Sequence, residues 1–313
     1  VLSAALHTAF AGQIPDYSME GYDKDIQKIY QNPQLKTKDM ARRVDIISGL
    51  FVGKSYLNDS LGEGKNAYFD QHALYRTDTF DCLTYVSTVL ALVESNNLSE
   101  FKKNILKTQY YDSDPTFVHR LHFTDADGNQ TNENNGFIED ITLSFKDEKG
   151  NTVAKTIHTF INKPAWFQKL PRSRLNFITP LSPAEENKRL DEMHELSRQV
   201  KPKNVTLPYL PLNALFNANE EPNTFIFNQI PSGSIIEIVR PNWDLRKLIG
   251  TKLNISHLGF AIRTKQGLLF REASSLENHV VDIPLIEYLK GYLHSTTVKG
   301  ISVYIVLNPL KTK

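Results

Sequence analysis

The chain has 313 residues, of which 40% are hydrophobic and 23% charged, and its formal net charge is +1 at pH 7. Its lysines and arginines are dispersed, so the sequence does not predict the clustered cations of a nucleic-acid-binding protein. No run of about eighteen apolar residues occurs, so no integral membrane segment is predicted.

The N-terminal segment is similar to the end of a secretory signal peptide. Residues 1–10 are mostly small or apolar, and Ala9-Phe10-Ala11 before Gly12 fits an A-x-A cleavage site. An ordinary small-residue stretch would have the same composition. On the first interpretation, residues 1–11 are the tail of the signal and residues 12–313 form a single domain. The protein is then exported to the periplasm or cell envelope of a bacterium.

Helical periodicity occurs in three segments. A helix capped by Thr37 and closed by Gly53 carries apolar residues at helical spacing: Met40, Val44, Ile47 and Phe51. A second helix starts near Cys82 and buries one apolar stripe: Val86, Val89, Leu90 and Val93. A third begins at a capping box with proline at the first helical position, residues 182–185, and runs to about Gln199. The prolines that follow predict irregular chain: Pro202, Pro208 and Pro211.

Apolar and alternating runs predict strands over 117–123, 138–145, 153–160, 235–239, 257–262, 268–273 and 300–307. Lys265-Gln266-Gly267 predicts a tight turn between the strands over 257–262 and 268–273. Short neighbouring strands joined by tight turns favour an antiparallel sheet. The predicted class is therefore α+β, with the helix that starts near Cys82 packed on the sheet.

Cys82 is the one cysteine of the sequence. Exported proteins usually hold cysteines in pairs, so a lone thiol is either reactive or buried and inert. The preceding Thr77-Asp78-Thr79-Phe80-Asp81 is rich in N-cap candidates, which places Cys82 in the first turn of its helix. Unpaired N–H groups and the positive end of the helix dipole favour a thiolate there, although the negative charge of Asp81 opposes it. The Cys82 N–H is also a candidate donor to an oxyanion.

His257 is the candidate general base for this thiol. It opens the apolar run Leu258-Gly259-Phe260-Ala261-Ile262, in which Gly259 would allow another segment or a ligand to approach closely. A histidine satisfied within the sheet is the alternative. Glu272, on the next predicted strand, would lie near His257 and accept its second ring N–H, and Ser274 shares that face. Alternatively, Glu272 pairs with Arg271 or another base.

Other chemistries have weaker support. His119 and His122 are three residues apart, but on a strand they face opposite sides, and no carboxylate follows at metal-ligand spacing. No glycine-rich phosphate loop and no Gly-x-Ser-x-Gly sequence is present. No metal site and no cofactor is predicted.

An ordered set of segments resembles the NlpC/P60 papain-like superfamily. The set comprises Phe80-Asp81-Cys82-Leu83-Thr84-Tyr85-Val86, then Ser256-His257-Leu258-Gly259-Phe260, then Phe270-Arg271-Glu272-Ala273-Ser274-Ser275. The long interval from Cys82 to His257 is similar to that of the larger N-acetylmuramoyl-L-alanine amidase-like branch (DUF1460). The segments His122-Phe123-Thr124 and 134–140 also resemble that branch. The resemblance spans roughly Tyr68 to Leu307.

The resemblance implies a papain-like core with the nucleophile on a helix N-terminus and a large mixed insertion at about 110–205. It implies hydrolysis of the amide between N-acetylmuramic acid and L-alanine in peptidoglycan fragments, with Cys82 as nucleophile, His257 as base and Glu272 in the third position. That position commonly holds histidine or another polar residue in the family, so the glutamate is a departure. Substrate contacts are predicted for six residues: Asp81, Tyr85, Asn135, Gly136, Asp140 and Ser274.

Three rival functions stay open at this point. The same residues would also serve a γ-D-glutamyl-diamino-acid endopeptidase, which cleaves one bond further along the stem peptide. The chain could equally be a catalytically silent wall-binding protein that keeps the fold. Acyl transfer to a lipid would need an apolar channel that the sequence does not reveal.

Overall fold

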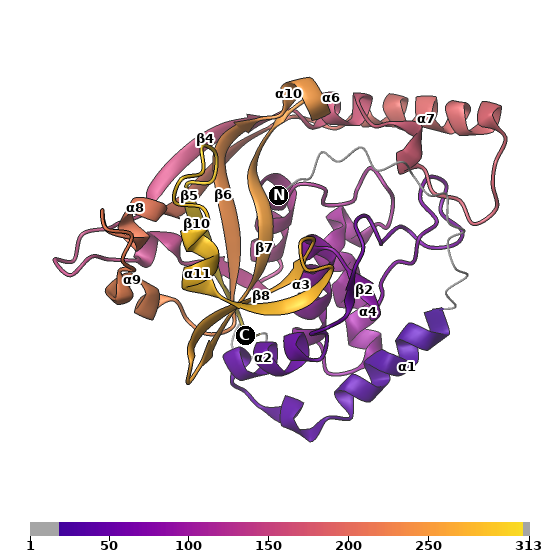
Figure 1. Cartoon of the computed structure of the whole chain (residues 1–313). Helices are drawn as coiled ribbons and strands as arrows, with labels where there is room; N and C mark the ends of the chain where they lie inside the picture. Colours follow the sequence, from indigo (N-terminus) through magenta and orange to yellow (C-terminus); the bar gives the residue numbers. More distant parts are fainter. Residues whose placement is uncertain (1–18, 309–313) are drawn as a thin grey trace.

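The computed structural model of the chain describes residues 19–308, and the predicted signal tail, residues 1–11, lies outside them (Figure 1). The helices of the described part are α1 (Met19–Tyr30), α2 (Met40–Gly49), α3 (Cys82–Val93), α4 (Leu98–Gln109), α5 (Asn129–Asn134), α6 (Lys163–Gln168), α7 (Pro183–Ser197), α8 (Leu212–Leu215), α9 (Thr224–Gln229), α10 (Arg246–Ile249) and α11 (Leu285–Lys290).

The strands of the described residues form one curled, mixed sheet (Figure 1). They are β1 (Ser55–Tyr56), β2 (Thr79–Phe80), β3 (Ile138–Asp140), β4 (Lys155–Ile161), β5 (Lys203–Pro211), β6 (Ser234–Asp244), β7 (Lys252–Thr264), β8 (Gly267–Ser274), β9 (His279–Pro284) and β10 (Gly300–Val306). Their order is β2-β1-β9-β8-β7-β6-β10-β5-β4, and β3 pairs with β10. The β1–β2 pair is parallel, whereas β6 to β9 form an antiparallel meander.

Helix α3 lies in the middle of one apolar layer. Its residues from Tyr85 to Val93 are all buried, although several are β-branched and favour helices only weakly. A helix that is apolar on all sides is stabilised by packing rather than by propensity. The helices α1, α2 and α4 surround α3, and together they cover one face of the sheet through Leu258 and Phe260.

The opposite face of the sheet is covered by α8, α9 and α11. The core on this side includes Ile236 and Ile238 of β6, Phe270 of β8 and Leu285 of α11. The sheet is therefore buried on both faces near its centre, and the segments at its edges are the ones that reach solvent. The segment predicted as an insertion, about 110–205, contributes β3 and β4 to this same sheet.

Several predicted elements occur as expected, and others do not. The helices at 40–49, 82–93 and 183–197 are present, but α2 is capped by Asp39, whose Oδ1 accepts from Arg42 N, and not by Thr37. The predicted strand over 117–123 is wrong, because that segment is irregular and only Arg120 forms an isolated bridge, with Tyr110. Similarly, only 138–140 of the predicted strand over 138–145 is extended in the sheet.

The prediction of irregular chain after Pro202 is also wrong. Residues Lys203–Pro211 form β5, in which the buried Val205, Leu207 and Tyr209 alternate with more exposed residues. Pro208 faces Thr156 of β4, and its carbonyl accepts from the Ser302 hydroxyl at 2.6 Å. The two-residue alternation therefore outweighs the prolines as a signal.

Candidate active site

Cys82 is the first residue of α3, and its position follows from a capping box. The Asp81 carboxylate accepts from Thr84 N at 2.8 Å, and Asp81 N donates to the Thr84 hydroxyl at 2.9 Å. The first N–H groups of a helix have no acceptor within the helix. Because the cap occupies Thr84 N, the Cys82 N–H stays available to an incoming oxyanion. The Cys82 side chain is half-buried, so its sulfur is neither sealed in the interior nor fully exposed.

His257 and Glu272 are hydrogen-bonded through His257 Nε2 and Glu272 Oε2. In the register of β7 and β8, Phe260 faces Arg271, so Glu272 lies diagonally from His257 on the same face. Arg271 lies on the other face, where it is paired with Asp282 and Asp45. The alternative pairing of Glu272 with Arg271 therefore does not occur.

Cys82 completes this arrangement from the other side of the imidazole ring. His257 accepts or donates a hydrogen bond with the Cys82 side chain, and since Nε2 faces Glu272, the nitrogen left for the sulfur is Nδ1. Burial alone lowers the pKa of His257, but the charges and hydrogen bonds of Cys82 and Glu272 outweigh it and raise the pKa to about 9. The structure thus brings together a sulfur, an imidazole and a carboxylate from α3, β7 and β8.

The raised pKa of His257 predicts a pH-dependent stability. His257 is protonated to higher pH in the folded protein, with a pKa of about 9, than at its ordinary value of 6.5. Its contribution to the free energy of unfolding is therefore complete below about pH 6.5 and is lost as the pH rises through about 9. Glu272→Gln removes one source of this shift, so we expect it to destabilise the protein by about 1–2 kcal/mol more at pH 6 than at pH 10.

Urea unfolding of the wild type and Glu272→Gln at the two pH values measures this difference. Glu277→Gln, an exposed change of the same type in the turn after β8, is the control. An equal loss of stability at both pH values would show that Glu272 does not act through the charge of His257.

Gly259 allows β8 to approach β7 closely beside His257. A Cβ atom at this position would lie 2.5 Å from the Arg271 carbonyl oxygen, 2.8 Å from the Phe270 ring and 3.0 Å from Glu272 Cβ. Real Cβ atoms do not occupy such short contacts, so β8 would have to move. The prediction that this glycine permits a close approach is confirmed, and the approaching segment is the one that carries Glu272.

Gly259→Ala is therefore expected to displace Glu272 from His257. We expect a loss of about 1–3 kcal/mol in the free energy of unfolding, since the substitution overpacks a buried site. Activity should fall by at least about tenfold, because a misplaced orienting group leaves the imidazole free to rotate. Gly21→Ala is the control, since its Cβ would meet no atom within 4 Å. Full activity in Gly259→Ala would contradict the positioning argument.

Two tyrosines that the sequence analysis missed lie beside the catalytic candidates. Burial and the nearby Cys82 raise the pKa of Tyr56, on β1, above its ordinary range. Tyr288, on α11, has its ring 6.4 Å from the His257 ring between centroids, and burial raises its pKa strongly, with a contribution from Glu272. Both hydroxyls are therefore neutral donors near the sulfur. Neither residue belongs to a recognisable motif, so only the fold places them here.

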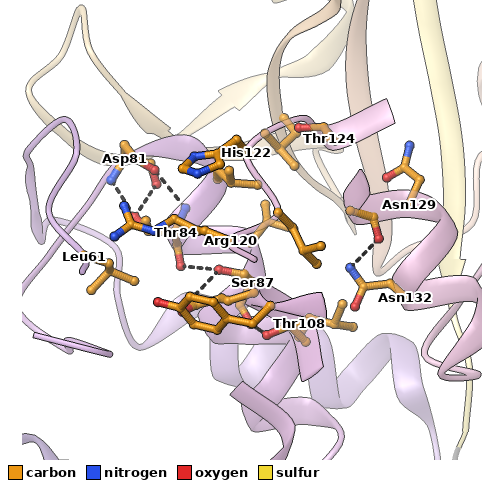
Figure 2. Close-up of a pocket in the computed structure, with 18 of the residues that line it drawn as sticks. Leu61, Asp81, Thr84, Ser87, Thr108, Arg120, His122, Thr124, Asn129 and Asn132 are labelled. Carbon is orange, nitrogen blue, oxygen red and sulfur yellow. Dashed lines mark hydrogen bonds between the residues drawn. The ribbon is translucent and has the colours of Figure 1, made fainter. Parts of the chain in front are cut away.

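A cavity of about 160 Å³ lies beside α3, and the residues that line it include Asp81, which precedes Cys82 (Figure 2). Asp81 and Thr84 lie at one end, and Asn129 and Asn132 lie at the other (Figure 2). Its apolar wall comes from α3 and from the facing strands: Leu83, Val86, Leu90, Ile235 and Leu258. An engineered cavity of about this size in another protein holds one benzene ring, so the space suits a group of similar size.

The polar groups of this cavity are mostly uncharged. Burial raises the pKa of Glu237 well above its ordinary value and thereby favours its neutral form. Burial, and then the charge of Arg120, lower the pKa of His122 well below its ordinary value, which also favours the neutral form. Asn132 Oδ1 is buried with no hydrogen-bond partner among the described residues. Arg120 is neutralised by Glu63 and Asp70. The cavity therefore suits a neutral ligand with both apolar and hydrogen-bonding atoms.

Of the predicted substrate-contact residues near Cys82 and Glu272, one lines the cavity and two are buried elsewhere. Asp81 lines the cavity, but Tyr85 is 0% exposed and its hydroxyl donates to the Ser48 carbonyl at 3.0 Å, so Tyr85 is a core residue. Ser274 is 3% exposed, and its hydroxyl accepts from Glu277 N at 3.3 Å, which is a structural role. For both residues, burial excludes the direct contact that we predicted.

The three substrate-contact residues predicted in the insertion do not line the cavity, whereas two nearby residues do. Asn135 is exposed and donates to the Lys107 carbonyl at 3.3 Å, and Gly136 follows it with φ of 72°. Asp140 accepts from Thr142 N at 2.8 Å. None of the three lines the cavity, whereas Asn129 and Asn132 of the same insertion do. The insertion therefore contributes to the cavity through other residues than the three predicted.

Two negative findings concern the described residues only. Residues 19–308 contain no group of three or more His, Cys, Asp or Glu side chains that could hold a metal ion. Within the same part of the chain, no helix has the length and apolar character needed to cross a membrane.

Comparison with known proteins relates the chain to cell-wall amidases. A crystal structure from Legionella pneumophila, with family model DUF1460, is 42% identical, covers 92% of this chain and 95% of its own chain, and has a TM-score of 0.88. A structure of an N-acetylmuramoyl-L-alanine amidase from Bacteroides uniformis is 23% identical, with 86% and 99% coverage and a TM-score of 0.59. A Bacteroides fragilis structure with a xylanase name is 22% identical, with 83% and 99% coverage and a TM-score of 0.57. The latter two likenesses, both under 25% identity, establish the fold alone.

A search of curated proteins finds no match. The family model described as AmiA-like, N-acetylmuramoyl-L-alanine amidase-like, matches residues 46–295, which include Cys82, His257 and Glu272. This match supports a peptidoglycan amidase-like function at the level of the family. The chain belongs to the AmiA-like family of N-acetylmuramoyl-L-alanine amidase-like proteins.

Proposed function

We propose that the protein is a cysteine amidase that cleaves the amide between N-acetylmuramic acid and L-alanine in peptidoglycan fragments, and that its core is of the papain-like NlpC/P60 type. The observation that carries the proposal is the contact of His257 with both Cys82 and Glu272, on a chain of an amidase-like family. A nucleophile, a base and a group that orients the base are the parts that acyl transfer requires. The family also favours an extracellular or envelope location.

The proposed reaction starts with attack of the Cys82 sulfur on the amide carbonyl carbon. The Cys82 N–H and the Tyr56 hydroxyl are the proposed donors to the oxyanion that forms. When the tetrahedral intermediate collapses, the C–N bond breaks and His257 Nδ1–H gives its proton to the leaving amine of L-alanine. The acyl group stays on the sulfur as a thioester.

Water completes the cycle. His257, now neutral, takes a proton from the water that attacks the thioester, and the acid product leaves as the thiol is restored. Glu272 accepts a hydrogen bond from His257 Nε2 during both acylation and hydrolysis of the thioester. It therefore keeps Nδ1 directed at the sulfur and stabilises the imidazolium. The cavity is the proposed site for part of the acyl group, because Asp81 and Leu83, the residues on either side of Cys82, both line it.

The bond cleaved is tested by the masses of the products from a defined N-acetylmuramyl peptide. Amidase action releases the complete peptide with a free L-alanine N-terminus and leaves an unsubstituted muramic acid. Endopeptidase action would release a shorter peptide and leave L-alanyl-D-glutamate on the sugar. The second pattern would overturn the proposed specificity, and no cleavage at all would favour a silent wall-binding protein.

A further inference from the structure

An arginine that has no carboxylate partner among residues 19–308 lies on β6, the strand that pairs with the strand of His257. Arg240, near the middle of β6, is half-buried, and its guanidinium carbon lies 4.6 Å from the centroid of the Trp243 ring. Its Nη1 donates to the Thr297 hydroxyl, and its Nε is buried with no acceptor. No ion pair of Arg240 occurs within residues 19–308. A partly desolvated cation with an incomplete hydrogen-bond set is costly unless an anion joins it.

Two tyrosines connect this arginine to His257. The Tyr288 ring lies 6.4 Å from His257 and 5.4 Å from Tyr292 between centroids, and Tyr292 Oη donates to Tyr288 Oη at 3.4 Å. Arg240 reaches the same part of the chain through Thr297, whose hydroxyl accepts from Arg240 Nη1, because Tyr292 and Thr297 both lie in the segment between α11 and β10. All three side chains are half-buried, so each is partly accessible to solvent. Together they extend from the His257 ring to the segment between α11 and β10. We call Tyr288, Tyr292 and Arg240 the arginine strip.

The chemistry of amide cleavage assigns this strip to one side of the scissile bond. His257 must give its proton to the nitrogen of the leaving amine, so the leaving group lies on the side of the imidazole. The strip extends from that side, whereas the cavity extends from Asp81 along α3. In the proposed reaction the leaving group is a peptide, and a peptide with a free C-terminus carries at least one carboxylate.

We propose that the arginine strip binds a carboxylate of the leaving peptide, with Arg240 as the cation and the two tyrosine hydroxyls as neutral donors. The inference rests on the proposed function, because that function makes the leaving group a peptide. A guanidinium binds a carboxylate with two parallel N–H donors, which is more specific than a lysine contact. The guanidinium of Arg240 therefore has two roles: it stacks on Trp243, and its charge selects peptides that carry a carboxylate.

Binding of the released peptide tests this independently of cleavage. The probes are L-alanyl-D-glutamate and the same dipeptide with both carboxyl groups amidated. Each is titrated calorimetrically into the inactive Cys82→Ala protein with and without Arg240→Gln. In the Cys82→Ala protein, amidation should weaken binding by about 10- to 100-fold, as expected for loss of hydrogen bonds to a charged group. Arg240→Gln should weaken binding of the free acid by a similar factor and leave binding of the diamide unchanged.

Kinetics of the active protein provide the second readout. With N-acetylmuramyl-L-alanyl-D-glutamate as substrate, Arg240→Gln should raise KM, and Arg240→Lys should recover part of the loss because it keeps a positive charge. Arg246→Gln is the matched control, since Arg246 is exposed and paired with Asp244. Thermal unfolding of each variant detects a folding defect. Binding of the diamide detects general damage to the site, because the diamide has no carboxylate for Arg240 to bind.

Three results would overturn the inference. The free acid and the diamide could bind equally, Arg240→Gln could weaken both by the same factor, or neither probe could bind. Failure of the proposed function is a different observation, since the active protein would then leave N-acetylmuramyl peptides intact while the calorimetric difference between the two dipeptides persists.

Discussion

Cys82→Ala is expected to abolish release of peptide from N-acetylmuramyl peptides, with a fall in rate of at least about 10³-fold. The substitution removes the atom that forms the thioester in the proposed reaction, and no second cysteine exists in the chain to replace it. Only positioning and the oxyanion donors would remain, and these stabilise a transition state that lacks its nucleophile. Chromatography coupled to mass spectrometry measures the released peptide.

The fold should tolerate this change. Cys82 is half-buried at the start of α3, where alanine is a favourable helix residue and the Asp81 capping box is unaffected. We therefore expect an unchanged thermal midpoint within a few degrees. Ser99→Ala, an exposed change in the first turn of α4, controls for a helix N-terminal substitution away from the site. Undiminished cleavage by Cys82→Ala would end the cysteine mechanism.

His257→Ala is the second change with a large expected effect, a loss of about 10²- to 10⁴-fold in kcat/KM. In the proposed reaction the imidazole acts twice, first as the donor to the leaving amine and then as the base for water. Its removal also leaves Glu272, which is 2% exposed, as a buried carboxylate without its partner. Activity and stability should therefore both fall, and the two are measured by steady-state hydrolysis and by urea unfolding.

A second measurement distinguishes catalysis from folding. Groups that act as one unit are non-additive, so the Cys82→Ala, His257→Ala double variant should be no slower than Cys82→Ala alone. His158→Ala, an exposed histidine on β4 that contacts Thr206, is the control. A double variant whose losses multiply would indicate that the two residues act independently.

The cysteine helix and the histidine hairpin could be predicted because their signals are local. The cap residues before Cys82 and the apolar run behind it lie within one helix, and a tight turn joins β7 to β8. A two-residue period then places Glu272 on the face of His257 with no knowledge of the rest of the molecule. The structure brings these two side chains together as that argument expected.

The cavity and the arginine strip could not be predicted, because their residues come from distant parts of the chain. Asn132, Glu237 and Leu258 meet only when the insertion closes over the sheet. Arg240 of β6 and Tyr288 of α11 lie on elements that come near His257 only through the pairing of β6 with β7 and the packing of α11. The predicted substrate contact of Tyr85 is wrong for the opposite reason. Tyr85 is three residues from Cys82 in the sequence, but its side chain points from α3 into the core.

The reactivity of the single thiol tests the central claim most directly, namely that Cys82 and His257 form one functional unit. At pH 6, iodoacetamide should alkylate Cys82 in the wild type at least about tenfold faster than in His257→Ala, because the imidazolium stabilises the thiolate. Mass spectrometry of the intact protein gives both rates without ambiguity, since the chain has one cysteine. Equal rates in the two proteins, or alkylation only after unfolding, would contradict the account.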